Sequence, residues 1–258
     1  MKRILIIILL YISFAFSSAN AQEQNKLETY FNKNQINQIN DYLKGFENIK
    51  TAHDLHRVYQ KIIEISGSLA DSLEVKVQST EDWSLDYDLL DTIVPGISFA
   101  GYEGTAVIVS PNLSIFIDLA ESTPEKSDDD FFEILFSVYG EDFFPAWIEQ
   151  TSDYSGVSLL GDDIELNTLK KIQNALISDK EFEPELNKLK VNIINDITHG
   201  NCYNYNSQKI IAEINKIITS IKLTEVETKM LKKRINEFKN PAKGLKIDCE
   251  NNDCDCGG

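Results

Sequence analysis

The 258-residue chain has almost no positive charge over a long central stretch. Between Asp71 and Glu165 it places 22 carboxylates against only two basic residues, Lys76 and Lys126. The formal net charge of the whole chain is −16. A surface this acidic repels nucleic acid phosphates and anionic lipid headgroups. The sequence therefore argues against a nucleic-acid partner.

The sequence also lacks the short motifs that mark common enzyme classes. It has no G-x-S-x-G, no H-E-x-x-H, no phosphate-binding glycine loop and no dinucleotide fingerprint. These absences remove the motif-based arguments for a serine hydrolase, a zinc protease and a nucleotide-dependent enzyme. No cofactor is predicted.

Only one long apolar run occurs, and it lies at the N-terminus. Ile4 to Phe16 follows two basic residues, and a small-x-small site ends at Ala21. This layout is typical of a secretory signal peptide over residues 1–21. The alternative is a membrane anchor, but the run is shorter than the roughly 20 residues that a span usually needs. We expect an exported protein, periplasmic or extracellular, with no membrane span after cleavage.

Apolar residues spaced three and four apart predict helices through most of the remaining chain. We expect a mainly α fold, an antiparallel helical bundle-like domain over residues 22–246, because short loops between helices favour antiparallel neighbours. Four helices between residues 166 and 240 show the clearest periodicity, and Thr224 with Glu227 predicts a capping box for the last. The Ser- and Gly-rich stretch 151–161 indicates a loop and a candidate boundary within this domain.

The most apolar passage of the mature chain runs from Thr92 to Glu121. Val, Ile, Phe and Tyr gather at 97–102 and 105–109, on either side of a Glu-Gly pair. This pattern allows a short β-hairpin near residues 97–109, and a buried irregular segment is the alternative. Ser110 and Pro111 then predict the start of the next helix.

Four cysteines are present, at Cys202, Cys249, Cys254 and Cys256. An even count in an exported chain predicts two disulfides, with Cys202 bridged to the acidic tail 247–258. The sequence does not choose among the three pairings, although a bridge from Cys254 to Cys256 would close a very small loop. The alternative is a soft-metal site in the tail, but the spacing matches no standard zinc pattern and no calcium loop.

Two sets of carboxylates are candidate site residues. Asp118 and Glu121 share a helix face and could serve as acid and base in a hydrolase. Asp128, Asp129 and Asp130 open a helix inside the acidic stretch and are the predicted contacts for a cationic partner. His53 and His56 also share a helix face, but the sequence offers no recognisable third metal ligand beside them.

Taken together, these patterns predict a binding or interaction module more than an enzyme. Crowded carboxylates repel one another, and either the basic region 166–246 or a basic protein or peptide would relieve that repulsion. Binding through such a face should weaken with salt. The alternatives are a secreted or periplasmic hydrolase that uses carboxylates, and a metal-binding protein that uses the C-terminal Cys/Asp tail.

Overall fold

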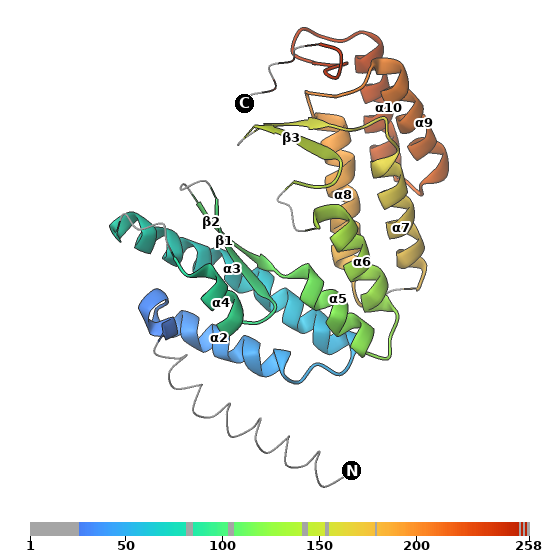
Figure 1. The fold of residues 1–258 in the computed structure, drawn as a ribbon. Helices are drawn as coiled ribbons and strands as arrows, with labels where there is room; N and C mark the ends of the chain where they lie inside the picture. Colours follow the sequence, from blue (N-terminus) through green and yellow to red (C-terminus); the bar gives the residue numbers. More distant parts are fainter. Residues whose placement is uncertain are drawn as a thin grey trace. The chain divides into compact units, whose positions relative to one another are not determined.

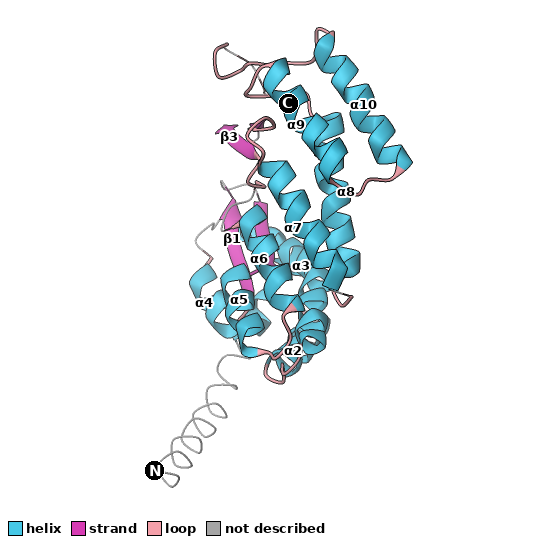
Figure 2. Ribbon diagram, turned by 90° about the vertical axis from the view of Figure 1, so that its right-hand side faces the viewer, coloured by secondary structure: helices cyan, strands magenta, loops and turns pink. Residues whose placement is uncertain are grey.

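The computed structural model describes residues 26–80, 85–102, 106–140, 144–152, 155–178 and 180–252, together with Cys254 and Cys256. The predicted signal peptide 1–21 lies outside these residues. Within them the fold is mainly helical, with ten helices and two small antiparallel hairpins (Figures 1 and 2). The predicted fold class is therefore confirmed. Among the described helices, none combines the length and apolar character needed to cross a bilayer.

The chain forms two compact units. Of the described residues, unit 1 comprises those up to Ile49 and those within Arg57–Asn112, and unit 2 comprises Lys50–His56 and those from Leu113 onward. The long helix α3 (Ala52–Thr80) contributes its first turn to unit 2 and the rest of its length to unit 1. The candidate boundary at 151–161 lies inside unit 2.

Unit 1 is built on α2 and α3. Besides α3 its elements are α2 (Lys33–Phe46), α4 (Tyr87–Ile93), β1 (Ile97–Tyr102) and β2 (Ala106–Pro111), and residues 26–30 are also helical. A capping box formed by Asn32 and Gln35 starts α2. The Gln35 amide also donates to the Ser68 carbonyl of α3 at 2.6 Å. One side chain therefore starts α2 and ties it to its neighbour.

The predicted hairpin near 97–109 is present as β1 and β2, which pair antiparallel with Ile97 opposite Pro111. The predicted helix start at Ser110 and Pro111 is wrong, because both residues belong to β2 and α5 begins at Leu113. Pro111 is tolerated at the end of this strand, where its missing N–H breaks no continuing ladder.

Unit 2 holds the remaining elements. They are α5 (Leu113–Ser122), α6 (Ser127–Tyr139), β3 (Ile148–Ser152), β4 (Ser155–Ser158), α7 (Ile164–Ser178), α8 (Glu183–His199), α9 (Ser207–Ser220) and α10 (Glu225–Lys239). Helix α7 contacts α6, α8 and α9, and α10 contacts α8 and α9. The sequence indicated a loop where the structure has the hairpin β3–β4. The hairpin was missed because these short, polar strands carry no clear alternation of apolar residues.

The core of unit 2 is made of the apolar faces of its helices. Ile193 of α8 and Ile214 of α9 have 0% of their surface exposed. Aromatic rings fill the space around α6, where Phe131 stacks on Phe182 with centroids 4.3 Å apart. Such burial supplies the main stabilising free energy of the unit.

Replacement of a single core residue tests this packing. Ile193→Asp should destabilise the protein by several kcal/mol, because it places an unpaired charge in the core. Val191→Asp, two positions away on the same helix and 48% exposed, is the matched control and should change stability little. Urea unfolding followed by circular dichroism measures both variants. Equal loss of stability in the two variants would contradict the assigned buried face of α8.

Candidate functional site

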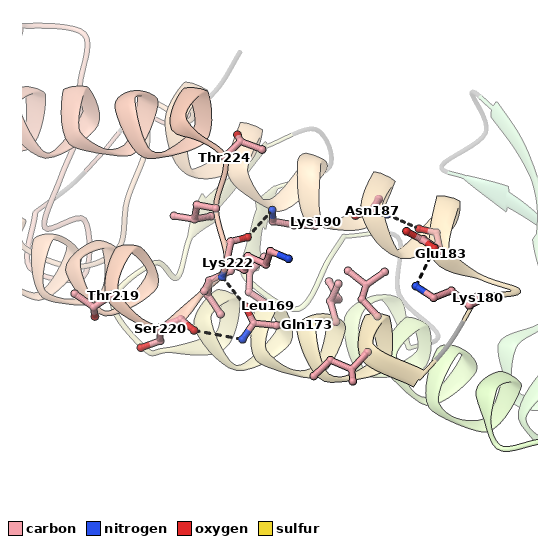
Figure 3. A pocket seen from close by; sticks show the side chains of 15 residues that line it. Leu169, Gln173, Lys180, Glu183, Asn187, Lys190, Thr219, Ser220, Lys222 and Thr224 are labelled. Carbon is pink, nitrogen blue, oxygen red and sulfur yellow. Dashed lines mark hydrogen bonds and ion pairs between the residues drawn. The ribbon is translucent and has the colours of Figure 1, made fainter.

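Helices α7 and α8 and the segment joining α9 to α10 line a pocket of about 780 Å³ (Figure 3). Its volume lies in the range typical of small-molecule sites. The apolar part of the lining is aliphatic and consists of Leu169, Ile172, Leu176, Ile177, Ile221 and Leu223. All of these residues belong to unit 2.

The pocket keeps its shape because a glutamine side chain fixes one of its walls. The backbone N–H of Lys222 donates to Oε1 of Gln173 at 2.5 Å. Nε2 of the same glutamine donates to the Ser220 carbonyl at 3.4 Å. Gln173 therefore bonds both a backbone N–H and a backbone carbonyl of the chain that follows α9, and it holds this segment against α7.

The charged part of the lining is predominantly positive. It contains Lys180, Lys190 and Lys222 against Glu183, and Glu227 of α10 pairs with Lys190, which leaves a formal local charge of +1. Figure 3 shows Lys180 with Glu183 toward one end and Lys190 with Lys222 toward the other. The chain as a whole carries −16, so the sign of the charge is reversed at this pocket.

The three lysines differ in how they are held. Lys190 donates to a carboxylate oxygen of Glu227 and to the Lys222 carbonyl, each at 3.0 Å. Lys180 pairs with Glu183 at 3.3 Å. The exposed ammonium of Lys222 makes no ion pair with any residue in the described part of the chain. Lys222 is therefore the cation available to a ligand.

Glu227 anchors the same end of the pocket from α10. The predicted capping box is confirmed, since Thr224 and Glu227 exchange side-chain and backbone hydrogen bonds. Burial of Glu227 opposes its ionisation, but the Thr224 N–H and the Lys190 ammonium hold its pKa below the usual value. The carboxylate is thus ionised at neutral pH and keeps Lys190 in place.

A buried carboxylate closes the start of α7. Glu213 of α9 has 0% of its surface exposed and accepts three backbone N–H groups, from Gly161 at 2.5 Å, Asp163 at 2.9 Å and Leu166 at 3.1 Å. Burial raises its pKa, and these hydrogen bonds oppose that rise. The start of α7 therefore receives hydrogen-bond acceptors from a side chain of α9.

Glu165 lies beside this cap and is 1% exposed. Its Oε2 atom is buried without a hydrogen-bond partner. Burial, followed by repulsion from Glu213, raises the pKa of Glu165 well above its usual range. These two carboxyls are perturbed in the manner of catalytic acids, but neither is accessible to a substrate.

The carboxylates predicted for hydrolysis stand elsewhere. Asp118 and Glu121 are both exposed on α5, three positions apart as expected. Neither residue lines the pocket. The structure therefore does not bring them together with the perturbed carboxyls Glu165 and Glu213.

The three aspartates predicted to meet a cationic partner differ in exposure. Asp128 is 0% exposed and accepts a 2.6 Å hydrogen bond from the Thr123 hydroxyl. Burial raises its pKa, and that hydrogen bond opposes the rise. Asp129 and Asp130 are half-buried at the first turn of α6. A partner would therefore meet Asp129 and Asp130, while Asp128 serves the start of the helix.

His53 and His56 do share a helix face, and the structure supplies partners that the sequence did not indicate. Nδ1 of each histidine lies within 2.9 Å of the same Glu181 oxygen, and Nε2 of His56 lies 2.8 Å from Glu185. The hydrogen bond from His56 is the main cause that lowers the pKa of Glu181. These glutamates are more than 120 positions away in sequence, so no local pattern signals the cluster.

The cysteines meet at the end of unit 2. Cys202 is joined to Cys256, and Cys249 is joined to Cys254. Cys202, Cys249 and Cys256 are also the one group, within the residues that the structure describes, that brings three potential metal ligands within 4.8 Å of one another. The tail thus lies against the loop that follows α8.

The buried Glu165 predicts a pH-dependent stability. Its pKa is raised on folding, so the native state loses stability as the pH rises above the unfolded value of about 4.3. Glu165→Gln should therefore stabilise the protein by about 1 kcal/mol at pH 8 and by less at pH 5. Thermal unfolding across this range measures the effect, with exposed Glu133→Gln as the control. A variant that is destabilised equally at both pH values would contradict the assignment.

The disulfide pairing is directly testable. Proteolysis of the oxidised protein without reductant, followed by mass spectrometry, should yield one peptide pair linked through Cys202 and Cys256. A second linkage should join Cys249 and Cys254. Recovery of Cys202 linked to Cys249 as the main species would contradict the pairing.

Comparison with known protein families, with curated proteins and with solved structures found no match. Function depends on the chemistry of a site and not on the fold that carries it.

Proposed function

We propose that unit 2 is a binding module that holds a small ligand with an aliphatic body and one anionic end. The ligand lies in the pocket between α7, α8 and the α9–α10 segment, with its anionic end toward Lys222. The observation that carries this proposal is the combination of an aliphatic lining with one lysine, Lys222, that no carboxylate of the described residues pairs with, in a chain of net charge −16.

The apolar lining supports an aliphatic ligand body. Ile177 is 78% exposed at this site, so a ligand would remove its surface from water. Burial of apolar surface contributes roughly 25 cal/mol per Å². None of the described residues that line the pocket is aromatic. The pocket thus offers no ring on which a sugar or a nucleobase would stack.

The charges support an anionic end group near Lys222. Lys190 is held by Glu227, and Lys180 by Glu183, so both ammonium groups already have a carboxylate. A carboxylate or phosphate near Lys222 would gain a charge-assisted hydrogen bond without displacing either pair. The polar end of the ligand is thereby oriented.

Binding is favoured over the hydrolase alternative by the placement of the carboxylates. A hydrolase needs two accessible carboxyl groups whose pKa values differ. In the described residues the strongly perturbed pair, Glu165 and Glu213, is enclosed, and Asp118 with Glu121 is on the open surface. Contact of a basic partner with Asp129 and Asp130 stays a separate prediction.

Calorimetric titration with decanoate, decanol and decylammonium tests the pocket proposal. Decanoate should bind about 2- to 5-fold more tightly than decanol, because one partly exposed ion pair contributes up to about 1 kcal/mol. Decylammonium should bind most weakly. Lys222→Gln should bring decanoate down to the affinity of decanol and leave decanol unchanged.

Lys188→Gln is the matched control, since it removes the same charge from an exposed position of α8 outside the pocket. It should leave the preference for decanoate intact. An equal effect of Lys188→Gln and Lys222→Gln would show that only overall charge matters. That result, or the absence of decanoate binding, would overturn the proposal.

A further inference from the structure

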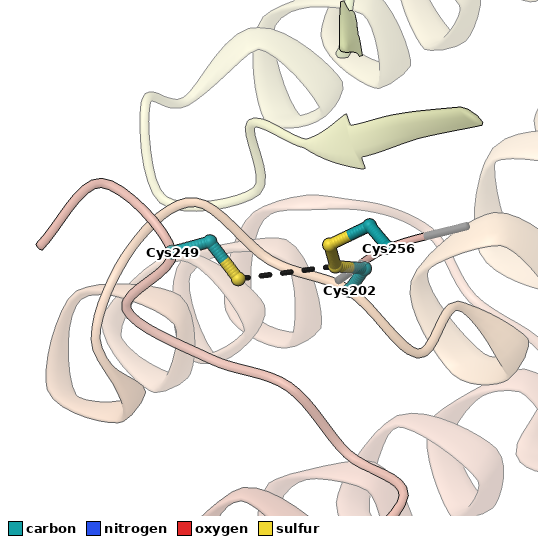
Figure 4. A group of neighbouring side chains, drawn as sticks. All are labelled: Cys202, Cys249 and Cys256. Atoms are coloured by element: carbon teal, nitrogen blue, oxygen red, sulfur yellow. Dashed lines mark hydrogen bonds between the residues drawn. A yellow bond between two sulfur atoms is a disulfide. The ribbon is translucent and has the colours of Figure 1, made fainter. Parts of the chain in front are cut away.

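The sulfur atoms at the end of unit 2 converge more closely than two separate disulfides require. Sγ of Cys202 lies 3.8 Å from Sγ of Cys249, which belongs to the other disulfide. Figure 4 shows the Cys249 side chain directed toward the Cys202–Cys256 bridge. Cys254 joins the group through its bond to Cys249. Three cysteine sulfurs therefore lie within 4.8 Å of one another, and the fourth is bonded to one of them.

This spacing matches the geometry of a tetrahedral thiolate site. Zinc–sulfur bonds of about 2.3 Å place neighbouring sulfurs about 3.8 Å apart at the corners of a tetrahedron. The separation between Cys202 and Cys249 equals this value, and Cys256 lies within 4.8 Å of both. Once the disulfides are reduced, these three sulfurs are close enough to share one ion.

We propose that the reduced form of this cysteine cluster binds one thiophilic divalent cation, of which zinc is the representative. Cys202, Cys249 and Cys256 are the primary ligands, and Cys254 supplies the fourth sulfur. The oxidised form, with both disulfides closed, has no thiolate to offer and does not bind the ion. The proposal is independent of the pocket between α7 and α8.

Backbone hydrogen bonds hold Cys249 beside the loop that carries Cys202 without help from the disulfides. The tail pairs with the loop after α8 through Tyr203 N–H to Lys246 carbonyl at 3.0 Å and Lys246 N–H to Asn201 carbonyl at 2.8 Å. Two further bonds, at 3.2 Å and 3.0 Å, join Cys249 N–H to the Tyr203 carbonyl and Glu250 N–H to the Asn204 carbonyl. Reduction therefore leaves Cys249 beside the Cys202 loop, with Cys254 and Cys256 only five and seven positions further along the chain.

A tight turn returns the tail toward Cys202. Asp248 has a positive φ of 63°, a conformation that Asp tolerates better than most residues. Its side chain accepts a 2.9 Å hydrogen bond from the Asn251 amide, and its backbone carbonyl accepts one from the Asn252 amide at 2.8 Å. The carboxylates of Asp248 and Glu250 also place negative charge near the cluster, which favours a cation.

The chemistry balances with a dithiol as the reductant. Each disulfide takes two electrons and two protons from one dithiol, which is itself oxidised to a disulfide, so that two dithiols generate four thiols. The cation then replaces the thiol protons, which are released to solvent. In the reverse exchange a disulfide oxidant takes two electrons from each pair of thiolates and, with two protons from solvent, becomes a dithiol, which reforms the protein disulfides and sets the ion free. The site therefore couples metal retention to the redox state.

The test uses the full-length mature chain in both redox states. The protein is reduced with a phosphine, which does not compete as a thiol ligand, and is titrated anaerobically with cobalt(II) and then with zinc. The reduced protein should bind one ion per chain, with thiolate-to-cobalt charge-transfer absorption that zinc abolishes. The oxidised protein should show neither. Far-ultraviolet circular dichroism establishes that the reduced protein keeps its helices.

Two substitutions separate a folded site from loose binding by the tail. Cys202→Ser leaves the three tail cysteines but removes the ligand from the body of unit 2, and it should lose stoichiometric binding. Lys243→Ser, an exposed position in the same terminal segment, should retain it. Equal binding by Cys202→Ser, or no cobalt absorption in the reduced wild type, would overturn the proposal.

Discussion

The backbone N–H and carbonyl groups at the buried ends of the helices in unit 2 need hydrogen-bond partners. The packing of the unit depends on which side chains supply them. An unpaired backbone N–H away from water costs free energy comparable to a lost hydrogen bond. Glu213 meets this demand by accepting three N–H groups at the start of α7. Because Gln173 binds the chain that follows α9, α7 and α9 are joined at two separate levels. The second of these ties fixes the wall of the pocket at Ser220 and Lys222.

The carbonyl groups at the C-terminal end of α8 are paired by a cation. Arg234 of α10 donates to the carbonyls of Ile197 and Gly200 and to the Tyr203 hydroxyl. Tyr203 is fully buried, and its backbone pairs with the C-terminal tail. Arg234 therefore holds the loop against which the cysteine cluster lies, whereas Gln173 holds the wall of the pocket. Glu213 of α9 binds the backbone at the start of α7, and Arg234 of α10 binds the backbone at the end of α8. In each case a buried charged side chain from a later helix pairs the free backbone groups at the end of an earlier helix.

The features that the sequence predicted are those encoded by neighbouring residues. Apolar spacing gave the helices, and Thr224 with Glu227 gave a capping box, because both patterns span only a few positions. The pocket could not be predicted in this way, since Gln173 and its partners are 47 or more positions apart. The burial of Asp128 was equally hidden, because three successive acids look alike until the fold turns one of them inward. Local patterns specify elements, whereas long-range polar contacts specify the site.

The bond between Cys202 and Cys256 spans 54 positions and encloses all of α9 and α10 in a covalent ring. A ring of this size lowers the conformational entropy of the unfolded chain, which stabilises the fold by a free energy on the order of 4 kcal/mol at 25 °C. It also changes how the molecule bears mechanical load. Tension applied at the C-terminus passes through the sulfur bridge to the loop after α8, so α9 and α10 are shielded from the pull. A single proteolytic nick between these two helices would likewise leave both pieces attached.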